Sequence, residues 1–456
     1  MQAFLDYYRC PADKVPIGIQ PQLSAQEGYF TFDGTVGFGR IGSGRPAADA
    51  AEPLTDLAGC VTVADGRHLL PFDISDVVTN LREERYRQNG HNWLRSTRAG
   101  SAARLLYYLL RPLLGVRVRK HLQKAHLSGW EQIPFPKWPV DVSVDTMMER
   151  TMMLALNARK QSSVPFIWFW PDDAPACAMI THDIEGQAGL DFCDELMDID
   201  DSYGIKSAFQ LIPGGREASW RNTASRLRHR GFEVNLHDLN HDGQLFARRD
   251  TFLRQARQIN EHAREFGCDG FRSGAMYREQ RWFDAFKFSY DMSVPNAAHL
   301  EPQRGGCCTV MPYFVGDILE LPLTTTQDYT LFFILNDYST ALWEQQIRLI
   351  SQRHGLISVI THPDYLIGPR ERAVYVQLLR HIANLRDARR LWVALPGEIN
   401  TWWRNRHAMR LVRGAEGWRI EGPDSHRARV AYATCENGSL VYRLQDVGDA
   451  AAVRSC

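Results

Sequence analysis

The sequence predicts an α/β domain of parallel strands and helices, with segments of different character on both sides. Between residues 176 and 395, short apolar runs alternate with amphipathic stretches of helical length. Strands that alternate with helices of this length are typical of βαβ units and a parallel sheet. Histidine and carboxylate clusters follow three of the apolar runs, at 182–185, 237–241 and 362–364. The carboxyl ends of such strands converge on one mouth, so these clusters are expected to share one site.

Composition limits the class of protein. At 456 residues the chain is long for one domain, so two or three units are expected. Basic and acidic residues number 53 each, which gives no reason to expect a nucleic-acid partner. The nine cysteines, an odd total with one adjacent pair, suit a reducing compartment. The first residues resemble no secretory signal, and no apolar run of about eighteen residues predicts a spanning helix. We therefore expect a cytoplasmic protein.

Residues 1–164 are expected to form an N-terminal extension of mixed structure. The region 16–63 is predicted to be loops with short strands, because its glycines are spaced too irregularly for a nucleotide-binding motif. Asp73 is expected to cap the helix that follows it. The segment 102–127 combines leucines with arginines and lysines, and Pro112 divides it into two helices.

Two interpretations of the basic segment 102–127 stay open. It can lie on an anionic membrane or contact a polysaccharide-assembly complex, which would place the protein at the inner face of the membrane. It can also be a pair of ordinary helices that pack on the main domain and expose their cations to solvent.

The main domain is expected over residues 165–403, after a rigid proline-rich connector at 134–139. Its elements follow from apolar periodicity. The expected strands are 176–181, 206–212, 232–236, 270–271, 356–361 and 391–395, and the expected helices are 190–203, 224–230, 251–266, 343–353 and 371–386.

Residues 404–456 change character again and are expected to form a small β-rich appendage. Short strand-like pieces occur at 418–420, 430–433 and 440–444. Asn437–Gly438 between the last two is typical of a hairpin turn.

The pair His237 and His241 indicates a metal site. Two histidines four residues apart also occur on a helix of zinc metalloproteases, with a glutamate base between them. Here the pair follows an apolar run, stops at Asp242–Gly243 and has Asp238 at the position of that base, which argues against a protease. Two imidazoles and a carboxylate would satisfy a divalent cation and leave a position for water.

Over residues 165–403, the chain resembles the polysaccharide deacetylases of carbohydrate esterase family four, a resemblance that implies a distorted (β/α) barrel. Two positions depart from the family's pattern. Ile184 separates two acidic residues that are adjacent in the family, and Asp238 replaces a serine or threonine. The segments that carry the resemblance, in order, are Thr-His-Asp-Ile-Glu at 181–185, His-Asp-Leu-Asn-His at 237–241, Gly-Phe-Arg-Ser-Gly at 270–274, Asp-Met-Ser at 291–293 and Val-Ile-Thr-His-Pro at 359–363.

The resemblance implies a role for each residue of the first two segments. Asp183 would be the catalytic base, and Glu185 would complete a metal site with His237 and His241. In the alternative register, Asp183 is the metal ligand. The expected cofactor is a divalent metal, Zn²⁺. Without the resemblance, an acidic pair after a strand often only caps the next helix.

The later segments are expected to supply the acid side and the substrate contacts. Arg272 would hold the base, because a planar guanidinium can donate two parallel hydrogen bonds to a carboxylate. Asp291 would orient His362 and favour its protonated form, so that His362 protonates the departing amine. Backbone N–H groups at 272–274 would stabilise the oxyanion. The expected substrate contacts are Tyr277, Asp364 and Tyr365, while Trp282 and Tyr329 are aromatic candidates with packing as the alternative.

The implied activity is metal-dependent removal of an N-acetyl group from a sugar of a glycan or glycan precursor, in polysaccharide biosynthesis or modification. Two alternatives stay open. Ile184 and Asp238 are compatible with a degenerate protein that binds glycans without turnover, and 102–127 is compatible with a scaffold of a polysaccharide-assembly complex. A scaffold needs no metal, and a binding protein releases no acetate.

Overall fold

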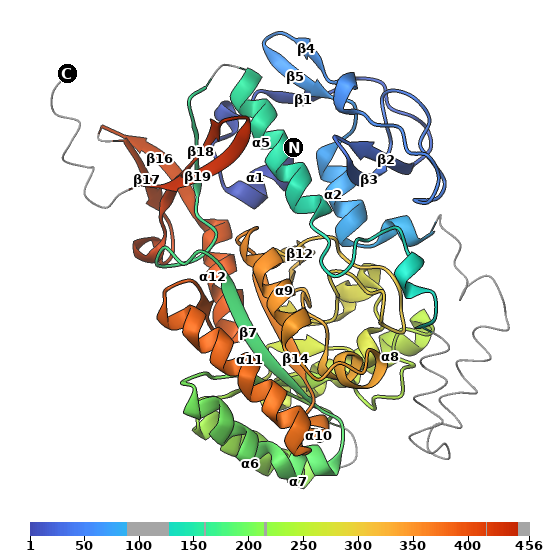
Figure 1. The fold of residues 1–456 in the computed structure, drawn as a ribbon, viewed down its shortest axis with the longest axis vertical. Coiled ribbons are helices and arrows are strands. Elements are labelled where there is room, and N and C mark those ends of the chain that lie inside the picture. The colour runs from blue at the N-terminus through green and yellow to red at the C-terminus, as the bar shows by residue number, and fades with distance from the viewer. Residues whose placement is uncertain (89–126, 159–160, 214–216, 416, 446–456) are drawn as a thin grey trace. The chain divides into compact units, whose positions relative to one another are not determined.

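The computed structural model describes residues 1–88, 127–158, 161–213, 217–415 and 417–445 (Figure 1). Their contacts divide the chain into two compact units. The first takes in the described residues of 1–91, 142–174 and 401–456, and the second those of 92–141 and 175–400. The expected boundaries after residues 164 and 403 stay a prediction. Except for Leu127, the basic segment 102–127 lies outside the described residues. Among the described helices, none has the length and apolar character needed to cross a membrane.

Among its described residues, the first unit contains two three-stranded sheets and two two-stranded ones. Asp73 caps α2, as predicted, by accepting a hydrogen bond from the backbone N–H of Ser75 at 2.8 Å. Its elements are α1 (Gln2–Tyr8), β1 (Ile17–Ile19), β2 (Gly28–Phe32), β3 (Thr35–Gly39), β4 (Thr62–Ala64), β5 (Arg67–Leu70), α2 (Ile74–Arg82), α5 (Ser143–Ala158), β6 (Val164–Ile167), β16 (Arg410–Gly414), β17 (Gly417–Glu421), β18 (Val430–Glu436) and β19 (Ser439–Leu444).

The C-terminal strands pair with a segment that precedes the barrel. β18 forms antiparallel ladders with both β19 and β6, and Asn437–Gly438 makes the turn of the β18–β19 hairpin with positive φ at both residues. The fully buried guanidinium of Arg406 donates to the carbonyl oxygens of Tyr7, Ile167 and Trp168. Three distant parts of the chain thus complete one unit.

The second unit is built on a curled, mainly parallel sheet, which confirms the distorted (β/α) barrel. The strand order is β12-β13-β11-β10-β9-β8-β7-β14, and β15 pairs with the start of β7. Only β12 and β13 are antiparallel. The strands are β7 (Cys177–Ile184), β8 (Ala208–Leu211), β9 (Glu233–His237), β10 (Gly270–Arg272), β11 (Tyr290–Asp291), β12 (Tyr313–Val315), β13 (Ile318–Glu320), β14 (Leu356–Thr361) and β15 (Trp392–Val393).

Helices cover the outside of this sheet, and Figure 1 shows α6 and α11 next to β7. Tyr375 of α11 donates to Asp200 of α6 at 2.6 Å, which joins the two helices. The helices are α6 (Gln187–Ser202), α7 (Glu217–His229), α8 (Arg249–Phe266), α9 (Ala341–Ser351), α10 (Pro363–Leu366) and α11 (Pro369–Asp387), with a π-helical turn η7 (Thr330–Ile334) before α9. α12 (Pro396–Ala408) begins in the second unit and continues into the first.

Threonine side chains hold the segment after β13 against the edge strand β14. The hydroxyl of Thr324 donates to the carbonyl of Leu356 and accepts from the N–H of Ser358. The hydroxyl of Thr325 donates to the carbonyl of Ser358. These bonds satisfy backbone groups of β14 and place the following residues, 326–330, beside its carboxyl end.

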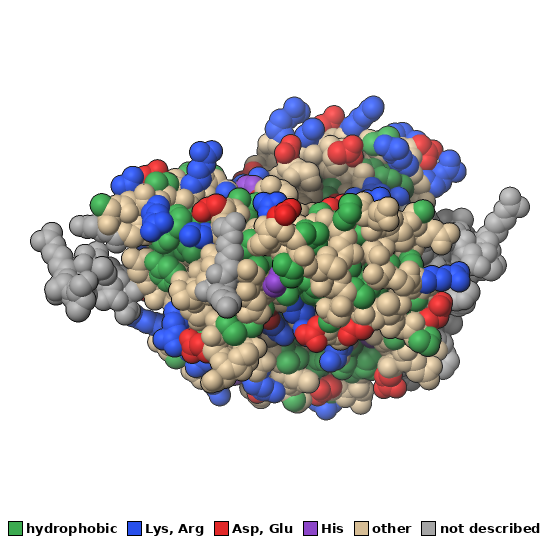
Figure 2. Space-filling model, turned by 90° about the horizontal axis from the view of Figure 1, so that it is seen from above, with side chains coloured by type: hydrophobic (Ala, Val, Ile, Leu, Met, Phe, Trp, Pro, Cys, Tyr) green, Lys and Arg blue, Asp and Glu red, His purple; other side chains and the backbone are tan. Residues whose placement is uncertain are grey.

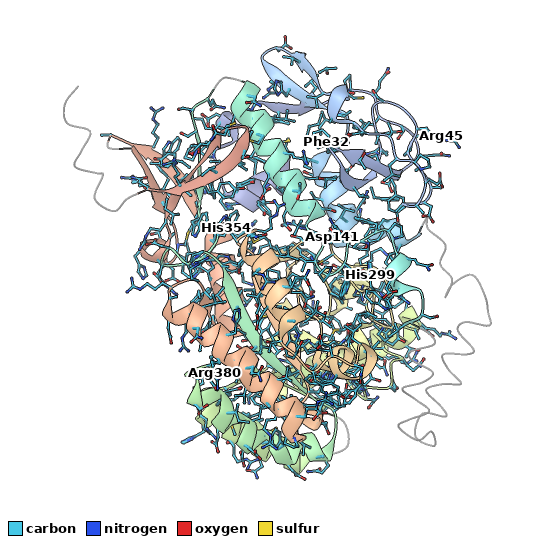
Figure 3. All side chains as sticks on the ribbon, viewed as in Figure 1. Phe32, Arg45, Asp141, His299, His354 and Arg380 are labelled. Atoms are coloured by element: carbon cyan, nitrogen blue, oxygen red, sulfur yellow. The ribbon has the colours of Figure 1, made fainter. Side chains whose placement is uncertain are left out.

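The proline-rich connector packs on the second unit. Asn296 accepts from the N–H of Asp141 and donates to its carbonyl, both at 2.7 Å. His299 Nε2 lies 2.6 Å from the carbonyl oxygen of Pro136. Figure 3 labels His299. On the face seen in Figure 2, Lys and Arg side chains are interspersed with Asp and Glu, as expected from equal numbers of both signs.

Candidate metal and acid–base site

The candidate site lies at the carboxyl ends of parallel strands. Glu185 directly follows β7, His237 is the last residue of β9, Arg272 is the last residue of β10 and His362 directly follows β14. His241 lies in the turn after β9 rather than on a helix, so the arrangement is unlike that of the metalloproteases. The strand ends bring together residues far apart in sequence, such as Glu185 and His362, whose Oε1 and Nε2 atoms lie 3.8 Å apart.

Glu185, His237 and His241 form a cluster that fits a divalent cation. One ligand atom from each lies within 4.8 Å of the others. His237 Nδ1 is 3.2 Å from the carbonyl oxygen of Arg272, so this nitrogen is the donor and Nε2 keeps its lone pair. That Nε2 atom is buried and has no hydrogen-bond partner, as expected of a metal ligand. His241 Nε2 lies 2.9 Å from Glu185 Oε1.

The protonation states of the cluster suit metal binding. Burial lowers the pKa of His237 to about 4, so its imidazole is neutral at pH 7. Burial opposes ionisation of Glu185, but the nearby His241, His362 and His237 outweigh it and lower the pKa of the carboxyl group. A neutral imidazole and an ionised carboxylate are the forms that bind a metal.

Asp183 is held by Arg272 inside the barrel. Arg272 Nη1 donates to Asp183 Oδ1 at 2.7 Å and to the hydroxyl of Thr181 at 2.8 Å, while Nε donates to the carbonyl of Met292 at 3.0 Å. The guanidinium therefore binds the carboxylate through one nitrogen and not through the two expected. Burial raises the pKa of Asp183, yet the charges of Arg272, His237 and His362 outweigh it and lower that pKa overall.

Asp328, and not Asp291, is the partner of His362. Asp328 Oδ1 accepts from His362 Nδ1 and Oδ2 from the His362 backbone N–H, both at 2.7 Å. Burial lowers the pKa of His362, but the carboxylates of Asp328, Glu185 and Asp183 outweigh it and raise the pKa to about 10. His362 Nε2, 3.8 Å from Glu185 Oε1, faces the metal cluster. The high pKa of His362 thus favours a protonated imidazole beside the candidate metal ligands.

The expected pairing of Asp291 with His362 is wrong. Asp291 accepts from the N–H and the hydroxyl of Ser293, both at 2.9 Å, and it lies in register with Glu320 on β13. Burial raises the pKa of both carboxyl groups. Asp291 is the last residue of β11 and is in register with Phe271, the residue before Arg272, so its side chain is on the opposite face of the sheet from that of Arg272. The sequence motif identified a buried carboxylate but assigned it the wrong partner.

The expected oxyanion donors are used by the protein itself. The N–H of Ser273 donates to the hydroxyl of Ser293 at 2.9 Å, and the N–H of Gly274 donates to Asp238 Oδ2 at 3.2 Å. Asp238 also accepts from the N–H of Leu239. A Cβ at Gly274 would lie 2.5 Å from Asp238 Oδ2, so this close approach requires glycine. Asp238 therefore stabilises the loops after β9 and β10.

The predicted substrate residues differ in their surroundings. Tyr365 packs against His362 with ring centroids 5.1 Å apart, and it also contacts Tyr329 and Phe333. These three aromatic residues are only partly buried. Asp364 accepts from the N–H of Gly189 at 3.0 Å and thereby stabilises the start of α6.

The remaining aromatic candidates are less suited to binding a sugar. Tyr277 is 8% exposed, which leaves little surface for a ligand. Trp282 packs against Phe252 and Phe246, with ring centroids 5.4 and 6.3 Å away. This contact fits the alternative that Trp282 is a packing residue and does not bind a sugar.

His182 belongs to a separate network behind β7. Its ring nitrogens lie 2.8 Å from the hydroxyl of Thr361 and 3.1 Å from Asp200 Oδ2. Asp200 also accepts from the hydroxyls of Ser207 and Tyr375, both at 2.6 Å. Alternation along the strand explains the separation, since His182 and its neighbour Asp183 point to opposite faces.

No protein-family model matches the sequence, and a search of curated proteins finds no match. Solved structures match in fold. A protein from Mycobacterium smegmatis described as a polysaccharide deacetylase is 18% identical, with a TM-score of 0.42 over 52% of this chain and 93% of its own. The peptidoglycan deacetylase PdaC from Bacillus subtilis is 11% identical, with a TM-score of 0.34 over 51% of this chain and 94% of its own. A mutant of BA3943, a family-four pseudoenzyme with restored activity, is 13% identical, with a TM-score of 0.34 over 50% of this chain and 68% of its own.

Proposed function

We propose that this protein is a metal-dependent hydrolase that removes the acetyl group from the nitrogen of an amino sugar in a glycan or glycan precursor. One observation carries the proposal. The cluster of Glu185, His237 and His241 lies between a carboxylate held by Arg272 and an imidazole held by Asp328. A metal site flanked by a base and an acid is what hydrolysis of an unactivated amide requires.

Each side chain then has a defined task. A divalent cation bound by the cluster would polarise the acyl oxygen and lower the pKa of a bound water. Asp183 accepts the proton of the attacking water, and Arg272 fixes its carboxylate for that transfer. His362 donates the proton at Nε2 to the departing nitrogen, while Asp328 holds Nδ1.

The acid side indicates where the sugar would bind. The nitrogen that leaves must lie next to His362, so the sugar that carries it occupies the space on that side of the site. Tyr365 packs against His362 on this side, and Tyr329 and Phe333 pack against Tyr365. Aromatic rings offer apolar surface with a polar hydroxyl, which suits the mixed faces of a pyranose.

Acetate release tests the proposal. Purified protein is incubated with N-acetylated mono-, oligo- and polysaccharides before and after removal of metal by a chelator and return of zinc. We expect acetate from at least one substrate, loss of activity on chelation and recovery with zinc. The Asp183→Asn variant is the negative control. A zinc-loaded protein that releases no acetate from any N-acetylated sugar would refute the assignment.

A catalytically degenerate glycan-binding protein is the second candidate. One observation favours it: the N–H groups of Ser273 and Gly274 already have acceptors within the protein. Stabilisation of the oxyanion would then depend on the metal alone. Zinc binding and glycan binding without acetate release would support this candidate.

A further inference from the structure

Gln210 is a buried polar residue at the centre of the barrel whose amide has no hydrogen-bond partner. It lies on β8 and is fully buried, and neither its Oε1 nor its Nε2 is paired. A methionine or leucine would fill the same space without leaving a buried amide unsatisfied. The described residues therefore provide no hydrogen-bond partner for this amide.

Strand register places Gln210 beside the candidate base. Gln210 pairs with Asp183 on β7 and with Asn235 on β9. Register partners in neighbouring parallel strands direct their side chains to the same face of a sheet. His237 lies two residues after Asn235 and pairs with Arg272, so all of these side chains share that face.

Two other groups on this face are complementary to the unpaired amide. Arg272 Nη2 is a buried donor without a partner. Asp183 Oδ2 is 3.7 Å from His237 Nε2, which is the nitrogen that would coordinate a cation. Gln210 carries one acceptor and one donor, which match the Nη2 donor and the Oδ2 acceptor.

We propose that Gln210 is a positioning residue that joins Asp183 to Arg272 when the metal site is filled. Its Nε2–H donates to Asp183 Oδ2 as His237 Nε2 turns to the cation, and its Oε1 accepts from Arg272 Nη2. Asp183 is then held through both oxygens instead of one. This inference rests on the proposed function and deepens it, because it assigns a residue that fixes the base.

The variant Gln210→Met tests the proposal against a matched control, Gln346→Met. Gln346 is also a buried glutamine of the second unit, but its amide is fully used. It accepts from the N–H of Thr326 at 2.9 Å and donates to the carbonyl of Pro139 at 3.1 Å. A glutamine with a purely structural role should therefore behave like Gln346.

Three measurements decide the outcome. In the metal-free protein, Gln210→Met should leave the melting temperature unchanged or raised, whereas Gln346→Met should lower it. With zinc bound, Gln210→Met should lower kcat by about ten- to a hundredfold without changing KM, and Gln346→Met should leave kcat unchanged. A crystal structure of the zinc-loaded wild type should show Gln210 Nε2 within about 3.2 Å of Asp183 Oδ2.

Each contrary result is informative. A drop in melting temperature for Gln210→Met equal to that of the control would make Gln210 a structural residue. A wild-type kcat in Gln210→Met, or no contact between Gln210 and Asp183 in the zinc-loaded crystal, would also overturn the inference. If the wild type turns over no substrate, the proposed function fails, while the melting temperatures and the crystal contact still decide the role of Gln210.

Discussion

Replacement of Asp328 by asparagine should remove the charge that keeps His362 protonated. Burial alone would lower the pKa of His362, and the carboxylate of Asp328 makes the largest contribution against it. The contact is direct, with 2.7 Å between Asp328 Oδ1 and His362 Nδ1. Asparagine has nearly the same shape, so the variant removes the charge and keeps most of the packing.

The size of the effect follows from the pKa of about 10 for His362 in the metal-free protein. An unperturbed histidine has a pKa of about 6.5. That rise corresponds to about 5 kcal/mol in favour of the protonated imidazole, at about 1.36 kcal/mol for each unit of pKa. Glu185 and Asp183 supply part of it and remain in the variant. Loss of one direct opposite charge should lower the pKa of His362 by about 1–3 units.

NMR titration of His362 in the metal-free protein measures this change directly. The matched control is Asp291→Asn, because Asp291 binds Ser293 and not His362. The control should leave the pKa of His362 where it is in the wild type. An unchanged pKa in Asp328→Asn, or an equal fall in both variants, would refute the assigned pairing.

Stability should change with pH in a defined direction. The folded-state pKa of His362 lies above its unfolded value, so protonated His362 stabilises the fold fully below about pH 6.5. This contribution is lost as the pH rises to about 10. Urea unfolding should therefore show a larger loss of unfolding free energy for Asp328→Asn at about pH 6 than at about pH 9.5. An equal loss at both values would indicate that the lost bonds, and not the charge, matter.

Five further variants test the other assignments. His237→Ala or His241→Ala should remove the bound metal because each deletes one of three ligands, and full occupancy by elemental analysis in the double variant would contradict the site. Asp183→Asn should abolish turnover with metal still bound, whereas Glu185→Gln should weaken the metal affinity. The reverse result in metal titrations and rate assays would support the alternative register. His362→Ala should lower kcat/KM by about 10²–10⁴-fold and remove the alkaline limb of its pH profile, whereas an unchanged profile would show that another group delivers the proton.

The long elements of the second unit could be predicted from apolar periodicity. β7, β9 and β14 occur within a few residues of the expected strands, so their ends locate Asp183, His237 and His362 at one mouth. Strands of two or three residues, such as β11 and β13, are too short for an apolar periodicity to be recognised in the sequence. These strands, and the segment after β13 that binds the backbone of β14, were therefore not predicted.

The partner of His362 could not be found from the sequence for the same reason. Asp328 follows the short strand β13 and a run of threonines, without a strong strand signal before it. Its position depends on Thr324 and Thr325, whose hydroxyls bind the backbone of β14. Such side-chain contacts link segments about thirty residues apart and leave no periodic pattern. Asp291 was expected from the order of the motifs that carry the resemblance, and no strand was expected directly before either Asp291 or Asp328.

The two flanking pairs place the base and the acid in opposite charge states within one buried site. Arg272 favours ionised Asp183, and Asp328 favours protonated His362. Each of the two also stabilises the charge of the other, since His362 lowers the pKa of Asp183 and Asp183 raises that of His362. In the proposed hydrolysis, Asp183 would gain a proton and His362 would lose one, so both charges would vanish together. Because the pKa of His362 lies far above that of Asp183, return of a proton to His362 and its loss from Asp183 is energetically downhill. In the proposed mechanism, the charge arrangement that prepares the reaction would therefore also restore the site after each turnover.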